Sequence, residues 1–209
     1  MKYSLLLMAI IFSFTLKAEQ KAITDTGKTV ILNDDGTWHY QGAVTAPETV
    51  KITFNKAIFK KDASQDFAVK SKKNNSAVAI NTKKWLFKPS TVNQAAEYQF
   101  VLKGKDVYGM LIAEAIGMTP EGLANIALIN ARKAAPNAKV IKKEYRIVNG
   151  KKMIYMEMSG SMQGINFVYC GYYYADQNGS TQLVTYTSSN LVKKYSADIE
   201  QFLNGLFFR

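Results

Sequence analysis

Residue types that carry out acid–base or nucleophilic chemistry are scarce in this chain. His39 is the only histidine and Cys170 the only cysteine among the 209 residues. A site that needs two histidines is therefore excluded. His39 could still assist a serine, but no Gly-x-Ser-x-Gly segment frames one. Because it stands between Trp38 and Tyr40 on an expected strand, we interpret His39 as a surface residue.

Carboxylate pairs offer the remaining route to catalysis. Asp62 and Asp66 lie four residues apart, and neither stands among apolar residues that would raise a carboxyl pKa for acid–base work. Only a cleft that gathered Asp62, Asp66 and His39 would favour an enzyme. The sequence therefore predicts a protein without catalytic activity and without a cofactor.

Sulfur-containing residues could instead bind a soft metal ion. Four methionines fall between residues 153 and 162, and thioethers can hold copper. Alternation along a strand puts only Met156 and Met158 on one face, beside Ile154, which favours gap-filling in a core. Cys170 lies among aromatic residues, which favours a buried thiol over a reactive one.

Positive charge is concentrated in one early segment. Residues 51–88 hold ten lysines against two aspartates, in a chain of net charge +11. Only three of the 27 basic residues are arginines, the type that phosphate and base-edge recognition favours, so no nucleic-acid partner is expected. Two polar loops supply the candidate residues for binding a partner or an anion: Lys70, Lys72, Lys73, Lys83 and Lys84. These lysines could bind an anionic surface or an acidic partner, or they could be solvated hairpin tips.

The N-terminus has the layout of a secretory signal peptide. Lys2 precedes an apolar run from Leu5 to Leu16, and Ala18 offers a small residue for cleavage before Glu19. The run is too short for a stable membrane span. Cleavage near Ala18, which removes residues 1–18, predicts a periplasmic or secreted protein with no transmembrane span in the mature chain.

Turn residues divide the rest of the chain. Residues 19–40 are expected to form a small β-meander with turns at Gly27 and Gly36, followed by a linker over residues 41–50. The main domain is expected over residues 51–209.

Strands and two amphipathic helices are expected in the main domain. Thr119 and Pro120 predict the start of a helix that Pro136 ends, and an apolar stripe predicts a second helix over about 190–206. Asn-Gly turns at 149–150 and 178–179 join four antiparallel strands between these helices. Earlier strands are expected at 50–54, 77–80, 97–102 and 106–113. This order predicts an α+β fold in which an antiparallel sheet is flanked by two amphipathic helices.

This arrangement resembles the PsbP-like family over about residues 70–206. The similarity rests on the segment around Trp85, on Thr119-Pro-Glu121, and on three later stretches: Gly171-Tyr-Tyr-Tyr174, Gly179-Ser-Thr-Gln-Leu-Val-Thr-Tyr186 and Tyr195-Ser-Ala-Asp-Ile-Glu-Gln-Phe-Leu203. The resemblance implies an α/β/α sandwich that serves as a scaffold for docking onto other proteins, with no shared catalytic residues. Separately, the Asp-Gly-Thr-Trp ending of the N-terminal meander resembles a short β-module of uncharacterised exported bacterial proteins, which implies no activity.

Two functions stay open at this point. The first is an exported, non-enzymatic accessory protein that docks onto a partner protein in the cell envelope. The alternative is a peripheral binder of anionic lipid or polysaccharide that uses the five candidate lysines. The oligomeric state is not predicted.

Overall fold

The described part of the chain begins after the expected signal peptide. A computed structural model describes residues 20–32, 38–41, 50–91 and 93–209. The signal peptide predicted at 1–18, and residues 42–49 of the predicted linker, lie outside the described residues.

A long antiparallel meander forms the centre of the fold. Its strands are β10 (Lys139–Val148), β11 (Lys151–Met162), β12 (Ile165–Asp176) and β13 (Gly179–Ser188). Asn149 and Gly150 adopt φ angles of 47° and 82°, the left-handed pair that a tight two-residue hairpin turn requires. The strand pairing predicted from the two Asn-Gly turns is therefore confirmed.

The meander is part of a sheet of eight strands. Beyond β13 follow β9 (Val107–Glu114), β8 (Tyr98–Leu102) and β7 (Trp85–Pro89), and β4 (Thr53–Phe59) forms the other edge. β4 runs parallel to β10, so the predicted wholly antiparallel sheet is wrong at this edge. Because most residues of β4 are exposed on both faces, the sequence carries no alternating pattern from which its pairing could be predicted.

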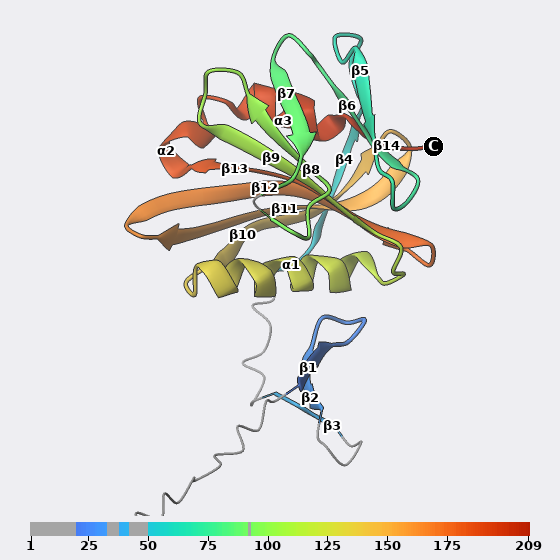
Figure 1. Cartoon of the computed structure of the whole chain (residues 1–209), viewed down its shortest axis with the longest axis vertical. Helices are drawn as coiled ribbons and strands as arrows, with labels where there is room; N and C mark the ends of the chain where they lie inside the picture. The colour runs from blue at the N-terminus through green and yellow to red at the C-terminus, as the bar shows by residue number, and fades with distance from the viewer. Residues whose placement is uncertain (1–19, 33–37, 42–49, 92) are drawn as a thin grey trace, which may run out of the picture.

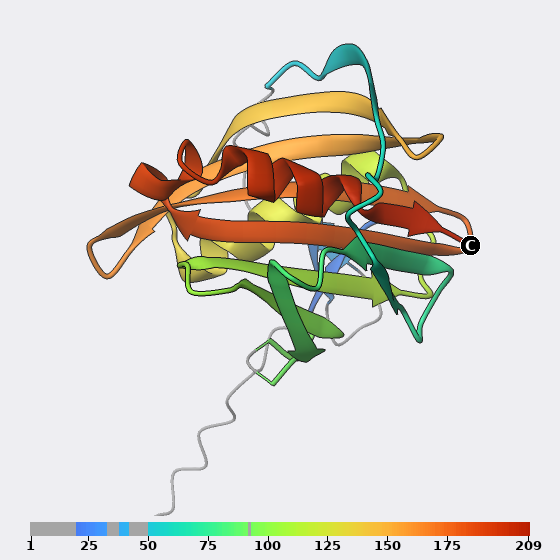
Figure 2. The ribbon, with the colours of Figure 1, turned by 90° about the horizontal axis from the view of Figure 1, so that it is seen from above.

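Different layers cover the two faces of this sheet (Figures 1 and 2). α1 (Pro120–Ala134) lies on one face, against β11 and β12. The other face carries α2 (Ser189–Val192), α3 (Ser196–Asn204) and a second sheet of β5 (Phe67–Lys70), β6 (Ser76–Ile80) and β14 (Leu206–Phe208). The fold is α+β, as predicted, but it is richer in sheet because the strands β5, β7 and β14 were not expected.

The C-terminal helix is shorter than predicted. Instead of one helix over 190–206, two short helices are separated by residues 193–195, and the chain turns at Gly205 into β14. A Cβ atom at Gly205 would overlap with the carbonyl oxygen of Ala79, so the chain passes close to β6 and pairs with it. Leu206 is fully buried in this strand, and a buried apolar residue in so short a segment does not distinguish helix from strand.

Each face of the large sheet has its own hydrophobic core. Tyr172 packs in the core beneath α3, and its neighbour Tyr173 packs in the core beneath α1. Met156 and Met158 are buried with Tyr173, which confirms their interpretation as core residues. Cys170 is buried as expected.

The N-terminal strands form a sheet of their own. β1 (Gln20–Ile23), β2 (Thr29–Leu32) and β3 (Trp38–Tyr40) pair antiparallel in chain order. Their first turn lies against α1, where Asn125 Nδ2 donates a hydrogen bond to Thr26 O at 3.4 Å. In Figure 1 this small sheet lies below α1, on the far side of the helix from the large sheet.

Candidate functional site

The five candidate lysines do not form one patch. Lys70 ends β5, and Lys72 and Lys73 lie in the turn that joins β5 to β6. Lys83 and Lys84 follow the opposite end of β6. Because a strand rises about 3.3 Å per residue, the five residues of β6 separate the two groups by roughly 13 Å.

The turn that carries the first group is held in place by polar side chains. Glu97 accepts a hydrogen bond from Ser71 Oγ at 2.7 Å. Asn74 reaches the large sheet, where its Nδ2 donates to Ser180 O at 3.0 Å. These bonds join the second sheet to the large one, which gives the polar residues of this turn a structural role.

The aspartates considered for catalysis are engaged in local hydrogen bonds. Asp62 accepts a hydrogen bond from Ser64 N at 2.8 Å, and Asp66 accepts from Thr82 N at 2.9 Å and Thr82 Oγ1 at 2.8 Å. Hydrogen bonds from Ser64 and Gln201 lower the pKa of Asp62, and those from Thr82 lower the pKa of Asp66. This direction is opposite to the one that a general acid at neutral pH requires.

The sheet face that carries α1 is only partly covered by it. α1 packs on β11 and β12, while β13, β9, β8 and β7 continue beyond the helix. In the strand register, five residues from β12 to β7 are direct cross-strand neighbours and so share this face. We call them the cross-strand row: Tyr169, Tyr186, Tyr108, Val101 and Leu86.

The cross-strand row presents apolar and aromatic surface to solvent. The rings of Tyr108 and Tyr186 stack with centroids 5.4 Å apart, and those of Tyr186 and Tyr169 lie 5.7 Å apart. Leu86 is 56% exposed and Tyr108 37%, and the other three are half-buried. The solvent face of an antiparallel sheet normally carries polar residues, whereas exposed aromatic clusters are typical of interaction surfaces.

Lysines border this row at the edge strand. Lys88 lies two residues beyond Leu86 and therefore on the same face of β7. Lys103 follows the end of β8, where its Nζ donates to Thr82 O at 2.7 Å, and the same turn holds Lys105 and Asp106. The outer end of the cross-strand row is thus both apolar and positively charged.

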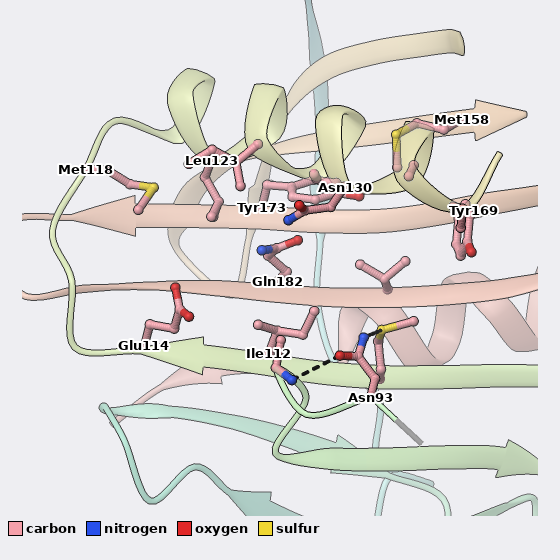
Figure 3. A pocket seen from close by; sticks show the side chains of 17 residues that line it. Asn93, Ile112, Glu114, Met118, Leu123, Asn130, Met158, Tyr169, Tyr173 and Gln182 are labelled. Carbon is pink, nitrogen blue, oxygen red and sulfur yellow. Dashed lines mark hydrogen bonds between the residues drawn. The ribbon is translucent and has the colours of Figure 1, made fainter. Parts of the chain in front are cut away.

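A pocket opens along α1, between the helix and strands β13 and β9 (Figure 3). Its volume is about 480 Å³. The walls are mainly apolar, with contributions from Leu123, Ala127, Ala131, Met110, Ile112 and Val184. Tyr169 lies at one end of the pocket and Glu114 and Met118 at the other, so the pocket adjoins the cross-strand row.

A buried ion pair lies on the opposite face of the sheet. Arg146 Nε donates to Glu144 Oε1 at 2.6 Å, and Arg146 NH1 donates to Tyr172 Oη at 3.2 Å. The guanidinium carbon lies 3.6 Å from the ring centroid of Tyr155, and Asn55 Nδ2 donates to Glu144 at 3.1 Å. Burial alone would raise the pKa of Glu144, but the hydrogen bonds from Arg146 and Asn55 outweigh it and lower the pKa. Because these groups satisfy one another, we assign the pair to stability.

Neither a clustered metal site nor a membrane-spanning helix is found among the described residues. Within the described ranges, no group of three or more His, Cys, Asp or Glu side chains is placed to hold a metal ion. No helix in the part of the chain that the structure describes is long and apolar enough to cross a membrane. Burial raises the pKa of Cys170 to about 12, so this thiol stays protonated at neutral pH.

Sequence reasoning did not find the cross-strand row, the pocket or the buried ion pair. The alternation of Tyr169 with its neighbours was visible, but the row depends on which residues of five strands lie side by side. Arg146 was counted only among the basic residues. Its contacts with Tyr155 and Tyr172 depend on strand register, which the sequence alone does not specify.

Comparison with known proteins identifies the fold. No protein-family profile matches the sequence, and no curated protein matches it. The solution structure of cyanobacterial PsbP (CyanoP) from Synechocystis matches with a TM-score of 0.52 and 9% identity, over 68% of this chain and 92% of that one. This likeness confirms the PsbP-like fold that the sequence resemblance implied.

Two further structures match less closely. A protein of unknown function from Pseudomonas aeruginosa, a putative regulator, gives a TM-score of 0.44 at 11% identity, over 68% of this chain and 97% of that one. A Bacteroides thetaiotaomicron protein gives a TM-score of 0.41 at 10% identity, over 65% and 45% of the two chains.

Proposed function

We propose that this protein is an exported, non-enzymatic accessory protein that docks onto a partner protein in the cell envelope. The observation that carries the proposal is the cross-strand row, a line of apolar and tyrosine side chains exposed on the sheet face beside α1. The PsbP-like fold and the layout of residues 1–18 support it.

The surroundings of the row indicate what kind of partner segment would bind there. Tyrosine rings offer large contact area with few rotatable bonds, which suits a protein interface. Lys88 and Lys103 at the outer end would attract carboxylates. The partner segment should therefore place apolar or aromatic side chains on the row and acidic side chains beside its outer end.

The alternative function is binding to anionic lipid or polysaccharide through the five candidate lysines. Their separation into two groups at the ends of β6 disfavours one continuous contact. Lys84 is also paired with Asp198, with Nζ 2.7 Å from Oδ1. Docking through the cross-strand row is therefore the better supported of the two proposals.

In-cell crosslinking followed by mass spectrometry tests the docking proposal. The variant carries Leu86→Ser and Tyr108→Ser, and its matched control carries Phe54→Ser and Ile58→Ser on β4, where both residues are also exposed. We expect the row variant to lose its dominant crosslinked protein and the control to keep it. Exposed interface residues of this kind contribute about 2 kcal/mol each when they are hot spots, so the loss should exceed tenfold.

Charge reversal separates the two candidate functions. Lys88→Glu with Lys103→Glu should weaken the same crosslink, because the partner segment is expected to be acidic. Reversal of the five candidate lysines should leave the crosslink in place. If that reversal instead removes only lipid or glycan adducts, and row variants crosslink normally, the protein is a charge-driven surface binder and the docking proposal is wrong.

A further inference from the structure

Two polar side chains in the floor of the α1 pocket lack hydrogen-bond partners. Tyr173 is fully buried, and its hydroxyl oxygen bonds to no group of the described chain. Gln182 lies directly opposite Tyr173 in the register of β12 and β13 and is 8% exposed. Its side-chain amide also makes no hydrogen bond within the described residues. A buried unpaired polar group normally costs about 1–3 kcal/mol, so the Tyr173 hydroxyl calls for an explanation, and the Gln182 amide beside it is free to bond to a group in the pocket.

The pocket above them has the size and lining of a ligand site. Its volume of about 480 Å³ falls within the range of small-molecule pockets, which are largely apolar with few polar groups. Small residues on α1, Ala127 and Ala131, keep the helix from filling this space. Figure 3 shows Tyr173 and Gln182 beneath the helix, between Glu114 at one end and Tyr169 at the other.

The charges around the pocket restrict the ligand further. Among the described residues that line it there is no lysine, arginine or histidine, and Glu114 is their single ionisable carboxyl group. An anionic head group would therefore meet a carboxylate in the wall, whereas Lys133, whose Nζ donates to Asn130 Oδ1 at 3.0 Å, lies outside the lining. The polar floor can donate and accept hydrogen bonds, since a phenol and an amide do both.

We propose that this pocket binds an uncharged, mainly apolar small molecule that carries one carbonyl or hydroxyl group. The apolar body lies along α1 against Met110, Ile112 and Val184, and the polar group bonds to Tyr173 Oη and the Gln182 amide. Ligand binding thereby satisfies the orphaned Tyr173 hydroxyl and gives the Gln182 amide a partner. This pocket is distinct from the docking surface, because it lies where α1 covers the sheet face and because its ligand is a small molecule and not a protein.

Fluorescence titration of the purified mature chain with Nile red tests the site. Nile red is uncharged and apolar and has one carbonyl group, and the anionic dye 1-anilinonaphthalene-8-sulfonate serves as the charge comparison. We expect saturable one-to-one binding of Nile red and at least tenfold weaker binding of the anionic dye. Tyr173→Phe should weaken Nile red binding about fivefold, the effect of one hydrogen bond.

Blocking variants show whether the dye sits in this pocket. Ala131→Phe fills the pocket from α1, and Asn130→Trp blocks it from an exposed position on the same helix. Both should abolish saturable binding. Lys133→Phe, on the same helix outside the lining, and Tyr108→Ser, in the cross-strand row, should bind as the parent does.

Three results would overturn the proposal. The first is the absence of saturable binding to a folded chain. The second is unchanged affinity for Nile red in both Asn130→Trp and Tyr173→Phe. This result would mean that internal water, and not a ligand, bonds to Tyr173 Oη and the Gln182 amide. The third is loss of binding in Tyr108→Ser, which would place the dye on the row instead. None of these results bears on the crosslinking test of docking, so the two proposals can fail separately.

Discussion

Adjacent tyrosines on β12 have opposite hydrogen-bonding states. Tyr172 Oη donates to Asn204 Oδ1 at 2.8 Å and accepts from Arg146 NH1 at 3.2 Å. Tyr173 Oη has no partner within the described chain. Both rings are fully buried. A comparison of Tyr172 with Tyr173 therefore separates the contribution of the hydroxyl group to stability from that of the ring.

We expect Tyr173→Phe to raise the free energy of unfolding by about 1 kcal/mol, because it removes an unsatisfied buried hydroxyl and leaves the ring in place. Tyr172→Phe is the matched control, and it should lower that free energy by about 1–2 kcal/mol because two partners lose their bond. Urea denaturation at neutral pH measures both. Destabilisation of Tyr173→Phe equal to that of Tyr172→Phe would mean that Tyr173 has a partner in solution.

The pair of Glu144 and Arg146 makes stability depend on pH. The folded-state pKa of Glu144 lies below its ordinary value of 4.5, because the hydrogen bonds from Arg146 and Asn55 outweigh the effect of burial. A carboxyl group with a lowered pKa stabilises the fold above its unfolded-state pKa. That stabilisation is lost as the pH falls through the folded-state pKa.

Glu144→Gln should therefore be less stable than the parent by about 3 kcal/mol at pH 7, since it leaves a buried arginine without its counter-charge. The difference should begin to shrink as the pH falls below about 4.5, where the unfolded-state carboxyl group binds a proton, and should disappear below the lower folded-state pKa, where the folded parent also loses the charge. Chemical denaturation at pH 7 and pH 3.5 measures it. Glu200→Gln, at an exposed position, should differ from the parent by about 0.5 kcal/mol or less at either pH. A pH-independent difference for Glu144→Gln would contradict the account.

Side-chain roles were predictable where they depend on local sequence. Thr119 was expected to cap the first helix, and its side chain does accept a hydrogen bond from Gly122 N at 3.1 Å. The core positions of Met156 and Met158 followed from alternation along one strand. Arg146 could not be placed in the same way, because its partners lie on neighbouring strands and a one-residue change of register would move it to the other face.

At the scale of elements, the contact between α1 and the N-terminal sheet depends on two glycines, one on each side of it. A Cβ atom on Gly122 would overlap with the carbonyl oxygen of Asp25 in the turn after β1. Gly27 in the same turn has φ 79° and lies against Gly122 O and the Cβ of Asn125. A glycine in a helix is unfavourable by up to about 1 kcal/mol relative to alanine, so close approach of the turn explains this one.

Gly122→Ala should release the N-terminal sheet from α1 without weakening the helix, which alanine favours. Hydrogen exchange measured by mass spectrometry should rise over residues 20–41 and stay unchanged over 120–134. Asn125→Ala, which removes one 3.4 Å hydrogen bond and no close contact, should have a smaller effect. Unchanged exchange over residues 20–41 in Gly122→Ala would show that the two parts do not rely on this contact.

Elements joined by short turns were predicted best. Asn149-Gly150 locates its hairpin because the turn requires left-handed φ angles that few other residue pairs accept, whereas Asn178 has no positive φ and Gly179 is already paired with Asp176. Edge strands and short strands were missed or misplaced because no turn residues or alternating pattern mark them. β7 has exposed residues on both faces, and β14 exists because Gly205 lets the chain approach β6, a long-range contact with no local signal.

At the scale of the whole molecule, the two faces of the large sheet are covered unequally. Among the described residues, one face carries two helices and a second sheet, whereas the other carries α1 beside the N-terminal strands (Figures 1 and 2). Eight strands are wider than one helix can cover. The uncovered part holds the cross-strand row, and the margin of the covered part holds the pocket, so both proposed sites follow from this asymmetry.

Site-specific photo-crosslinking tests the docking claim most directly. A photoreactive phenylalanine analogue is placed at Leu86 or Tyr108 in the row, and at Ile58 on β4 as the control. We expect crosslinks from both row positions to one segment of one envelope protein, with apolar and acidic residues in that segment, and none to it from Ile58. Crosslinks to that protein from Ile58 alone, or no protein crosslink from either row position, would contradict docking through the cross-strand row.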